Sequence, residues 1–207
     1  VPARAGAGHV QASAKASVKA SAQAGTLSQA VALKRISVGL NGNAADGDSF
    51  APSMSADGRY VAFASDATNL VPNDTNGARD IFVLDRDTDG DGVYDEPGFV
   101  KIVRVSVRSD GGQASAPIGG ARAPDSDNPS ISADGRFVAF ESWASDLVQG
   151  DTNNTADIFV HDRDADGDGI FDEPGAIATW RVSVRSGGAQ SNDSFGFSVQ
   201  PAVSGNG

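Results

Sequence analysis

The chain has 207 residues, of which 39% are hydrophobic and 21% charged, a composition that fits a globular protein with one sizeable core or two small ones. Sixteen Lys and Arg against 27 Asp and Glu give a net charge of −11, which argues against nucleic acid as a partner because phosphate backbones require clustered positive charge. Cysteine is absent and no apolar run is long enough to span a bilayer, which excludes disulfide scaffolds, thiolate metal sites and a membrane-spanning helix.

The first 33 residues differ in composition from the rest of the chain. They contain no Asp or Glu and consist mainly of Ala, Ser, Gly and Gln. Such a segment has too few large apolar side chains to bury a core. We therefore predict a low-complexity leader or linker over residues 1–33 and a folded part over residues 34–207.

The folded part is organised by an internal repeat with an offset of 77 residues. Residues 54–63 (MSADGRYVAF) recur as residues 131–140 (ISADGRFVAF), and the same offset relates two later pairs of segments. These pairs are DIFV at 80–83 and 157–160, and RVSV at 104–107 and 181–184. A register held over this length indicates duplicated supersecondary units.

Each unit reads as four β-strands. Short β-branched and aromatic runs are bounded by Asp, Gly, Asn and Pro, and Asp-Gly pairs at 57–58 and 134–135 supply the tight turn of a hairpin. The sequence therefore predicts an all-β fold with repeat units at about 51–107 and 128–184. The expected strands are 51–55, 59–65, 80–85 and 101–107 in the first unit, and 128–132, 136–142, 157–162 and 178–184 in the second.

Partial copies of the repeat flank the two complete units. Residues 35–38 (RISV) are similar to the end of a preceding unit, and residues 200–204 (QPAVS) are similar to the start of a following one. The repeat pattern therefore extends beyond the two complete units on both sides.

The order of these segments resembles the bacterial TolB-like, WD-type β-propeller repeats over about residues 34–204. The resemblance implies two complete four-stranded blades plus partial flanking blades, in a secreted, periplasmic or cell-surface protein that binds or scaffolds without catalysis. Closed propellers use roughly four to eight blades. We therefore expect a fragment of a larger propeller, with the remaining blades or other copies of the chain closing the ring.

Two acidic loops depart from that pattern, because a short turn normally joins the third and fourth strands. Residues 85–96 (DRDTDGDGVYDE) and 162–173 (DRDADGDGIFDE) hold six acids each, so that 12 of the chain's 27 acids lie in 24 residues. Both satisfy the calcium-loop pattern of alternating Asp, a central Gly and a later Glu. Calcium takes six to eight oxygen ligands, and a bound cation removes the repulsion between crowded carboxylates. The sequence therefore predicts one Ca²⁺ site in each loop.

The register of the ligands stays open between two alternatives. Counting from Asp85 gives Asp85, Asp87, Asp89, the Asp91 carbonyl and Glu96, as in an EF-hand. Counting from Asp87 gives a loop similar to those of thrombospondin type 3 repeats and dockerins, which we favour. The candidate ligands are therefore Asp85, Asp87, Asp89, Asp91, Val93 (carbonyl), Asp95 and Glu96 in the first loop, and Asp162, Asp164, Asp166, Asp168, Ile170 (carbonyl), Asp172 and Glu173 in the second.

The apolar pair in each loop, at 93–94 and 170–171, is expected to fold back onto its own blade as a small satellite core. Ser49 lies in a Gly-Asp-Ser-Phe segment that is similar to a hydrolase nucleophile block. A related segment precedes the next repeat, so we assign it to the repeat pattern and expect no enzyme activity. His161, on a strand where the other unit has Leu84, is expected to be a strand residue and not a general base.

The function expected from these observations is a non-catalytic binding or scaffold module stabilised by structural calcium. Its ligand would be a protein, a peptide or a glycan, with no nucleic acid and no membrane span. Weak calcium loops suit the millimolar calcium outside cells, which agrees with a secreted, periplasmic or cell-surface location. The alternative is that the chain is the non-catalytic propeller part of a larger secreted hydrolase or peptidase.

Overall fold

The structure is a computed structural model of the chain, and it describes residues 33–115, 123–153, 155–190 and 200–207. The leader predicted over residues 1–33 therefore lies almost wholly outside the described residues. The chain divides into a unit of residues 1–34 and a unit of residues 35–207. The second unit carries the repeats and is described below.

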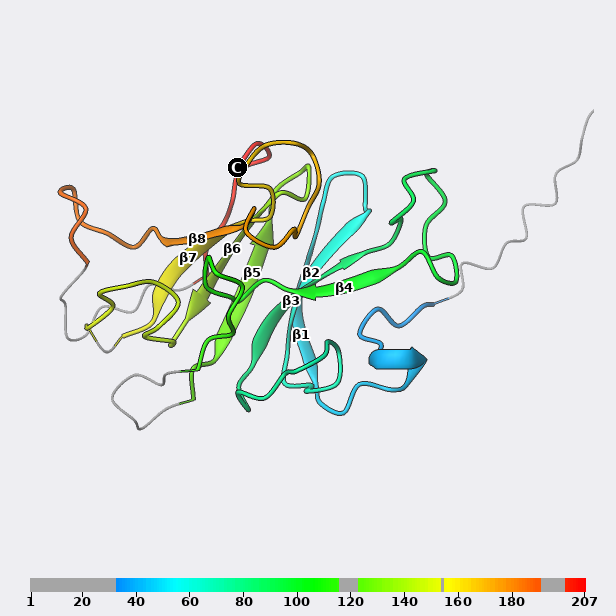
Figure 1. Cartoon of the computed structure of the whole chain (residues 1–207), viewed down its shortest axis with the longest axis horizontal. Coiled ribbons are helices and arrows are strands. Elements are labelled where there is room, and N and C mark those ends of the chain that lie inside the picture. Colours follow the sequence, from blue (N-terminus) through cyan, green and yellow to red (C-terminus); the bar gives the residue numbers. More distant parts are fainter. Residues whose placement is uncertain (1–32, 116–122, 154, 191–199) are drawn as a thin grey trace, which may run out of the picture. The chain divides into compact units, whose positions relative to one another are not determined.

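The described part of the chain is all-β, with a single turn of 3₁₀-helix at Leu40–Gly42 (η1). Two four-stranded antiparallel sheets are formed, each with its strands in sequence order (Figure 1). The first sheet contains β1 (Ser49–Met54), β2 (Tyr60–Ser65), β3 (Asp80–Asp85) and β4 (Lys101–Arg104), and the second contains β5 (Ser126–Ile131), β6 (Phe137–Ser142), β7 (Asp157–Asp162) and β8 (Ala178–Arg181).

The predicted number and order of the strands are confirmed, as is the hairpin formed by the first two strands of each unit, whereas β4 and β8 end three residues earlier than predicted. The amide of Ile81 donates to Ser106 Oγ (3.0 Å) and not to a backbone carbonyl, and Ile158 donates to Ser183 Oγ (3.1 Å) in the same way. Beyond β4 and β8, a serine hydroxyl thus accepts the hydrogen bond that a backbone carbonyl would accept in a regular strand pair. This substitution cannot be read from apolar alternation.

Successive apolar side chains of β2 and β3 point to opposite faces of the first sheet, and both faces are buried. Ala62, Ile81 and Val83 pack with Val138 and Phe140 of the second sheet in one core cluster. The opposite face, which includes Phe63, Phe82 and Leu84, forms a second cluster that is covered in part by Ile36 and Ala45. The two sheets therefore pack face to face through the alternating residues of their central strands.

The C-terminal residues take the same place on the second sheet that β5 and its turn take on the first. The amide of Ala56 donates to the Ala133 carbonyl (3.0 Å), and the amide of Ala133 donates to the Gly205 carbonyl (3.0 Å). Likewise Ile131 donates to Ser53 Oγ (3.2 Å) and Val203 to Ser130 Oγ (3.1 Å). These contacts agree with the prediction that residues 200–204 are similar to the start of a repeat.

The N-terminal partial copy behaves in the same way. An isolated bridge joins Val38 to Ala44, as equivalent bridges join Val107 to Gln113 and Val184 to Gln190 after the fourth strand of each sheet. Residues 35–45 therefore take the place that the end of a repeat would take.

Candidate metal centres

Each acidic loop joins the third and fourth strands of its sheet, as predicted, and backbone hydrogen bonds close it at its base. Thr88 donates to the Phe99 carbonyl (2.9 Å) in the first loop, and Ala165 donates to the Ala176 carbonyl (2.7 Å) in the second. The strands thus hold both ends of each loop, and the acidic residues between them form a compact turn.

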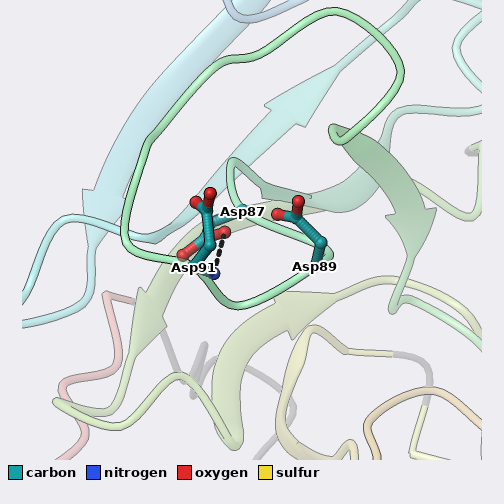
Figure 2. Close-up of side chains that lie close together, drawn as sticks. All are labelled: Asp87, Asp89 and Asp91. Carbon is teal, nitrogen blue, oxygen red and sulfur yellow. Dashed lines mark hydrogen bonds between the residues drawn. The ribbon is translucent and has the colours of Figure 1, made fainter.

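Three carboxylates converge in the first loop. Oxygen atoms of Asp87, Asp89 and Asp91 all lie within 4.8 Å of one another, with Asp87 buried and the other two exposed. Figure 2 shows the three side chains together on the loop, with the backbone amide of Asp91 donating to Asp87. This alternation places every second side chain on one side of the turn, where the three carboxylates could hold a metal ion.

The second loop repeats this arrangement 77 residues later. Asp164, Asp166 and Asp168 bring carboxylate oxygens within the same 4.8 Å, again with the first residue buried and the other two exposed. Both copies of the repeat thus fold their carboxylates into an equivalent cluster.

The buried aspartate of each loop organises the backbone around the cluster. Asp87 accepts hydrogen bonds from the amides of Gly90 (3.0 Å), Asp91 (3.2 Å) and Gly92 (3.0 Å). Asp164 accepts the equivalent bonds from residues 167–169 at 3.0 to 3.1 Å. Gly90 and Gly92 have φ values of 72° and 87°, which only glycine adopts without strain. The glycines therefore permit the turn that brings the carboxylates together.

Desolvation, together with the crowding of negative charge, raises the pKa values of two acids in the first loop. Desolvation raises the pKa of Asp89, and its hydrogen bond to Asp87 and the charge of Asp91 act in the same direction. Desolvation also raises the pKa of Glu96, with added repulsion from Asp91, Asp89 and Asp87. Glu96 therefore shares the field of the cluster, and a cation bound there would relieve this repulsion.

The other two acids of each loop are paired with arginines. Asp85 accepts two hydrogen bonds from Arg59 (2.9 Å each), and Asp95 accepts two from Arg86 (3.1 and 2.6 Å). In the second loop, Asp162 pairs in the same bidentate manner with Arg136. Asp172 pairs with Arg163.

The structure thus separates the candidate ligands into two groups. It brings together Asp87, Asp89 and Asp91, and their counterparts in the second loop, which both registers share. It places Asp85 and Asp95 on guanidinium groups outside the triplet, although each is a ligand in one of the two registers. The Val93 and Ile170 carbonyls and Glu173 stay predictions, because no contact assigns them to the cluster.

The expectation for the apolar pair of each loop holds only in part. Val93 and Ile170 are 52% and 55% exposed, so they form no satellite core. The Tyr94 hydroxyl donates to the Asp57 carbonyl of its own sheet (3.3 Å), whereas Phe171 packs against Tyr60 of the other sheet. The second residue of each pair is therefore the one that makes contacts.

The side chains considered for catalysis are engaged in the sheets. Ser49 Oγ donates to Ser65 Oγ (3.0 Å), and the equivalent pair Ser126 and Ser142 is bonded in the same way in the second sheet. His161 is buried, and this burial lowers its pKa to about 4, so the imidazole is neutral at physiological pH. Its Nδ1 lies 2.8 Å from Thr179 Oγ1, and that hydroxyl donates to the Val107 carbonyl of the first sheet (2.6 Å).

The ligand pattern of the sequence does not reveal the four arginines that hold the loops, Arg59, Arg86, Arg136 and Arg163. The signal was present, because Arg59 and Arg136 follow the Asp-Gly turn, and Arg86 and Arg163 follow the first Asp of each loop at the same 77-residue offset. An arginine that recurs at the same position of both units indicates that it pairs with an acidic side chain that also recurs in both units.

Comparison with known proteins gives no assignment, since no family model, curated protein or solved structure matches the chain. Within the described residues, no helix has the length and apolar character needed to cross a membrane.

Proposed function

We propose that this chain is a calcium-binding segment of a TolB-like β-propeller that acts, without catalysis, as a binding or scaffold module outside the cytoplasm. Its two sheets would be consecutive propeller blades. Calcium would be structural, fixing the long connection between the third and fourth strand of each blade.

The observation that carries this proposal is the selective pairing of the acids in each loop. Arginines neutralise Asp85 and Asp95, whereas no arginine contact is made within the described residues by Asp87, Asp89 or Asp91. The hydrogen bonds to Asp87 shape the turn, but no cationic side chain of the described residues offsets, by pairing, the repulsion between the three carboxylates that converge within 4.8 Å. A divalent cation gives this arrangement a physical reason.

Calcium is favoured over other cations by the chemistry of the donors. The cluster contains only oxygen donors, which excludes a preference for soft or borderline metals. Magnesium demands a near-ideal octahedron and retains several waters, whereas calcium accepts many carboxylate oxygens in a flexible geometry. A loop with three convergent carboxylates and a neighbouring Glu96 therefore suits calcium.

The blade assignment is supported by the way the sheets succeed one another. Each is a four-stranded antiparallel meander in sequence order, and residues 201–207 bond to the second sheet as β5 and its turn bond to the first. Successive sheets of the same topology, each packed face to face on the next, are typical of propellers and other repeat architectures.

The metal preference can be tested by dialysing the chelator-stripped protein against equal concentrations of Ca²⁺ and Mg²⁺ and measuring the bound ions. We expect two calcium ions per chain and little magnesium. The matched variants Asp91→Asn and Asp168→Asn should each remove one ion. Magnesium in place of calcium, or no bound ion, would refute the proposal.

A further inference from the structure

One aromatic ring links the two sheets beside the second acidic loop. The ring of Tyr60, at the start of β2, is 8% exposed and lies 5.5 Å from the ring of Phe171 in that loop. The guanidinium carbon of Arg163 lies 4.8 Å from the Tyr60 ring centroid and 4.9 Å from the Phe171 centroid. Tyr60 is thus held by an arginine and an aromatic residue of the next repeat.

Arg163 is positioned for this contact by hydrogen bonds within its own repeat. Its Nε and Nη2 donate to Asp172 (2.9 and 2.6 Å), and its Nη1 donates to the Gly135 carbonyl (2.8 Å). Gly135 itself lies against the Tyr60 ring, because a Cβ added there would come within 2.1 Å of a ring carbon. The turn at Gly135, the arginine and Phe171 together form a receptor for the ring.

The first loop contains the same receptor, and no ring from the described part of the chain lies in it. Arg86 donates to Asp95 (3.1 and 2.6 Å) and to the Gly58 carbonyl (2.8 Å), and its guanidinium carbon lies 5.1 Å from the Tyr94 ring centroid. Among the described residues, no second aromatic ring packs against Tyr94. The Arg86 side chain is 25% exposed, compared with 2% for Arg163.

We propose that Arg86 and Tyr94 form a docking site for the aromatic ring of another repeat of this kind, carried by an Asp-Gly-Arg-(Tyr/Phe) turn. The chemistry of the partner follows from the occupied receptor. Tyr60 follows Arg59 in such a turn, and the Arg59 guanidinium stacks on its ring at 4.9 Å. Phe137 follows Arg136 with the same stacking at 4.8 Å, so either ring serves.

A second copy of this chain does not fit as that partner. Its available ring would be Phe137, but Gly207 already lies against Phe137 as Gly135 lies against Tyr60, with an added Cβ 2.3 Å from the ring. If Phe137 of a second copy docked on Arg86, Gly58 would have to lie against the Phe137 ring. Gly207 of that copy already lies there. A repeat whose aromatic ring lacks such a covering turn meets no obstruction, and it is therefore the occupant that the geometry favours.

The proposal can be tested by adding such a repeat to the full chain. A second copy of residues 46–103 is inserted between Lys34 and Arg35, so that residues 35–38 complete its fourth strand. The inserted tyrosine that corresponds to Tyr60 would then face Arg86. Thermal unfolding is followed for the natural and the extended chain, each with and without Tyr94→Ala.

In the natural chain we expect Tyr94→Ala to lower the melting temperature by no more than about 2 °C, since no aromatic ring of the described residues packs against Tyr94. In the extended chain we expect a fall of about 5 °C or more. The matched control replaces the inserted copy of Tyr60 by Ala, which should return the effect of Tyr94→Ala to its size in the natural chain.

Equal effects of Tyr94→Ala in the two chains would overturn the proposal. So would an inserted segment whose amides stay unprotected from hydrogen exchange while the rest of the chain is folded. The measurements are made both in calcium and in chelator. Because Arg86 is held by Asp95 and Gly58 and not by the triplet, loss of the calcium proposal would leave this comparison interpretable.

Discussion

The ring of Tyr60 in the first sheet lies 5.5 Å from the ring of Phe171 in the acidic loop of the second repeat, at an interplanar angle of 41°. The loop that carries a candidate metal cluster is therefore also part of the contact between the two sheets. Order in that loop and packing of the repeats share the same residues, since Arg163 and Asp172 lie within the loop.

Phe171→Ala should destabilise the protein more than the neighbouring change Ile170→Ala. Removal of a buried phenylalanine costs about 3–5 kcal/mol, and since Phe171 is only half-buried we expect about 2 kcal/mol. Ile170 is 55% exposed and should cost less than about 0.5 kcal/mol. Urea unfolding of the two variants measures the difference, and equal losses would show that Phe171 does not hold the sheets together.

The metal clusters predict a calcium-dependent effect of single aspartates. Asp89→Ala and Asp166→Ala should each lower the melting temperature in 1 mM calcium but change little in chelator. At a dissociation constant of about 10⁻⁴ M, each site would contribute about 1.4 kcal/mol at this concentration. Melting curves under both conditions provide the measurement, and an equal loss with and without calcium would assign the aspartates to the fold alone.

Whether Asp95 is a ligand, as the register that starts at Asp87 requires, can be tested by comparing it with Asp91. Because Asp95 is held by Arg86, Asp95→Asn should keep two calcium ions per chain while weakening the loop's ion pair. Asp91→Asn removes a carboxylate of the triplet and should leave one ion. Calorimetric stoichiometry distinguishes them, and loss of an ion in Asp95→Asn would restore Asp95 as a ligand.

Much of the fold follows from the sequence because the repeat is expressed in local patterns. The Asp-Gly turns, the alternation in β2 and β6 and the 77-residue offset predicted eight strands in the correct order. The convergence of Asp87, Asp89 and Asp91 could be predicted for the same reason, since neighbouring residues on one turning loop decide it.

The interactions between distant residues could not be predicted in this way. Arg59 meets Asp85 only because β2 and β3 pair in a register that places Tyr60 opposite Asp85. Likewise Phe171 was expected on its own blade but packs on the preceding sheet, since the distance between the sheets decides which surface it reaches. Such contacts depend on tertiary geometry and not on local pattern.

Burial of His161 predicts a loss of stability in acid. Its pKa is about 4 in the folded chain, lowered by burial, against about 6.5 when unfolded. The unfolded state therefore binds more protons, and stability falls as the pH drops from 6.5 to 4, by up to about 3 kcal/mol. His161→Leu, which copies Leu84 of the first repeat, should abolish this loss in urea unfolding followed against pH.

Asp151 should change the stability with pH in the direction opposite to that of His161, over an overlapping pH range. Burial, assisted by the charge of Asp157, raises its pKa from 3.8 to about 6. The folded state then binds more protons, so this group favours folding at low pH and loses that contribution as the pH rises through 6. In the His161→Leu background, stability should therefore rise on acidification from pH 6.5 to 4, and Asp151→Asn should remove the rise. If the stability of the His161→Leu variant did not change between pH 6.5 and 4, the raised pKa of Asp151 would be contradicted.

The account depends most directly on the two carboxylate clusters, and a calcium titration by calorimetry on chelator-stripped protein tests them. We predict two ions bound per chain in the natural protein and none in the double variant Asp89→Ala, Asp166→Ala. Absence of a binding heat, confirmed by absence of any calcium-dependent shift in melting temperature, would contradict the central claim that these loops are metal sites.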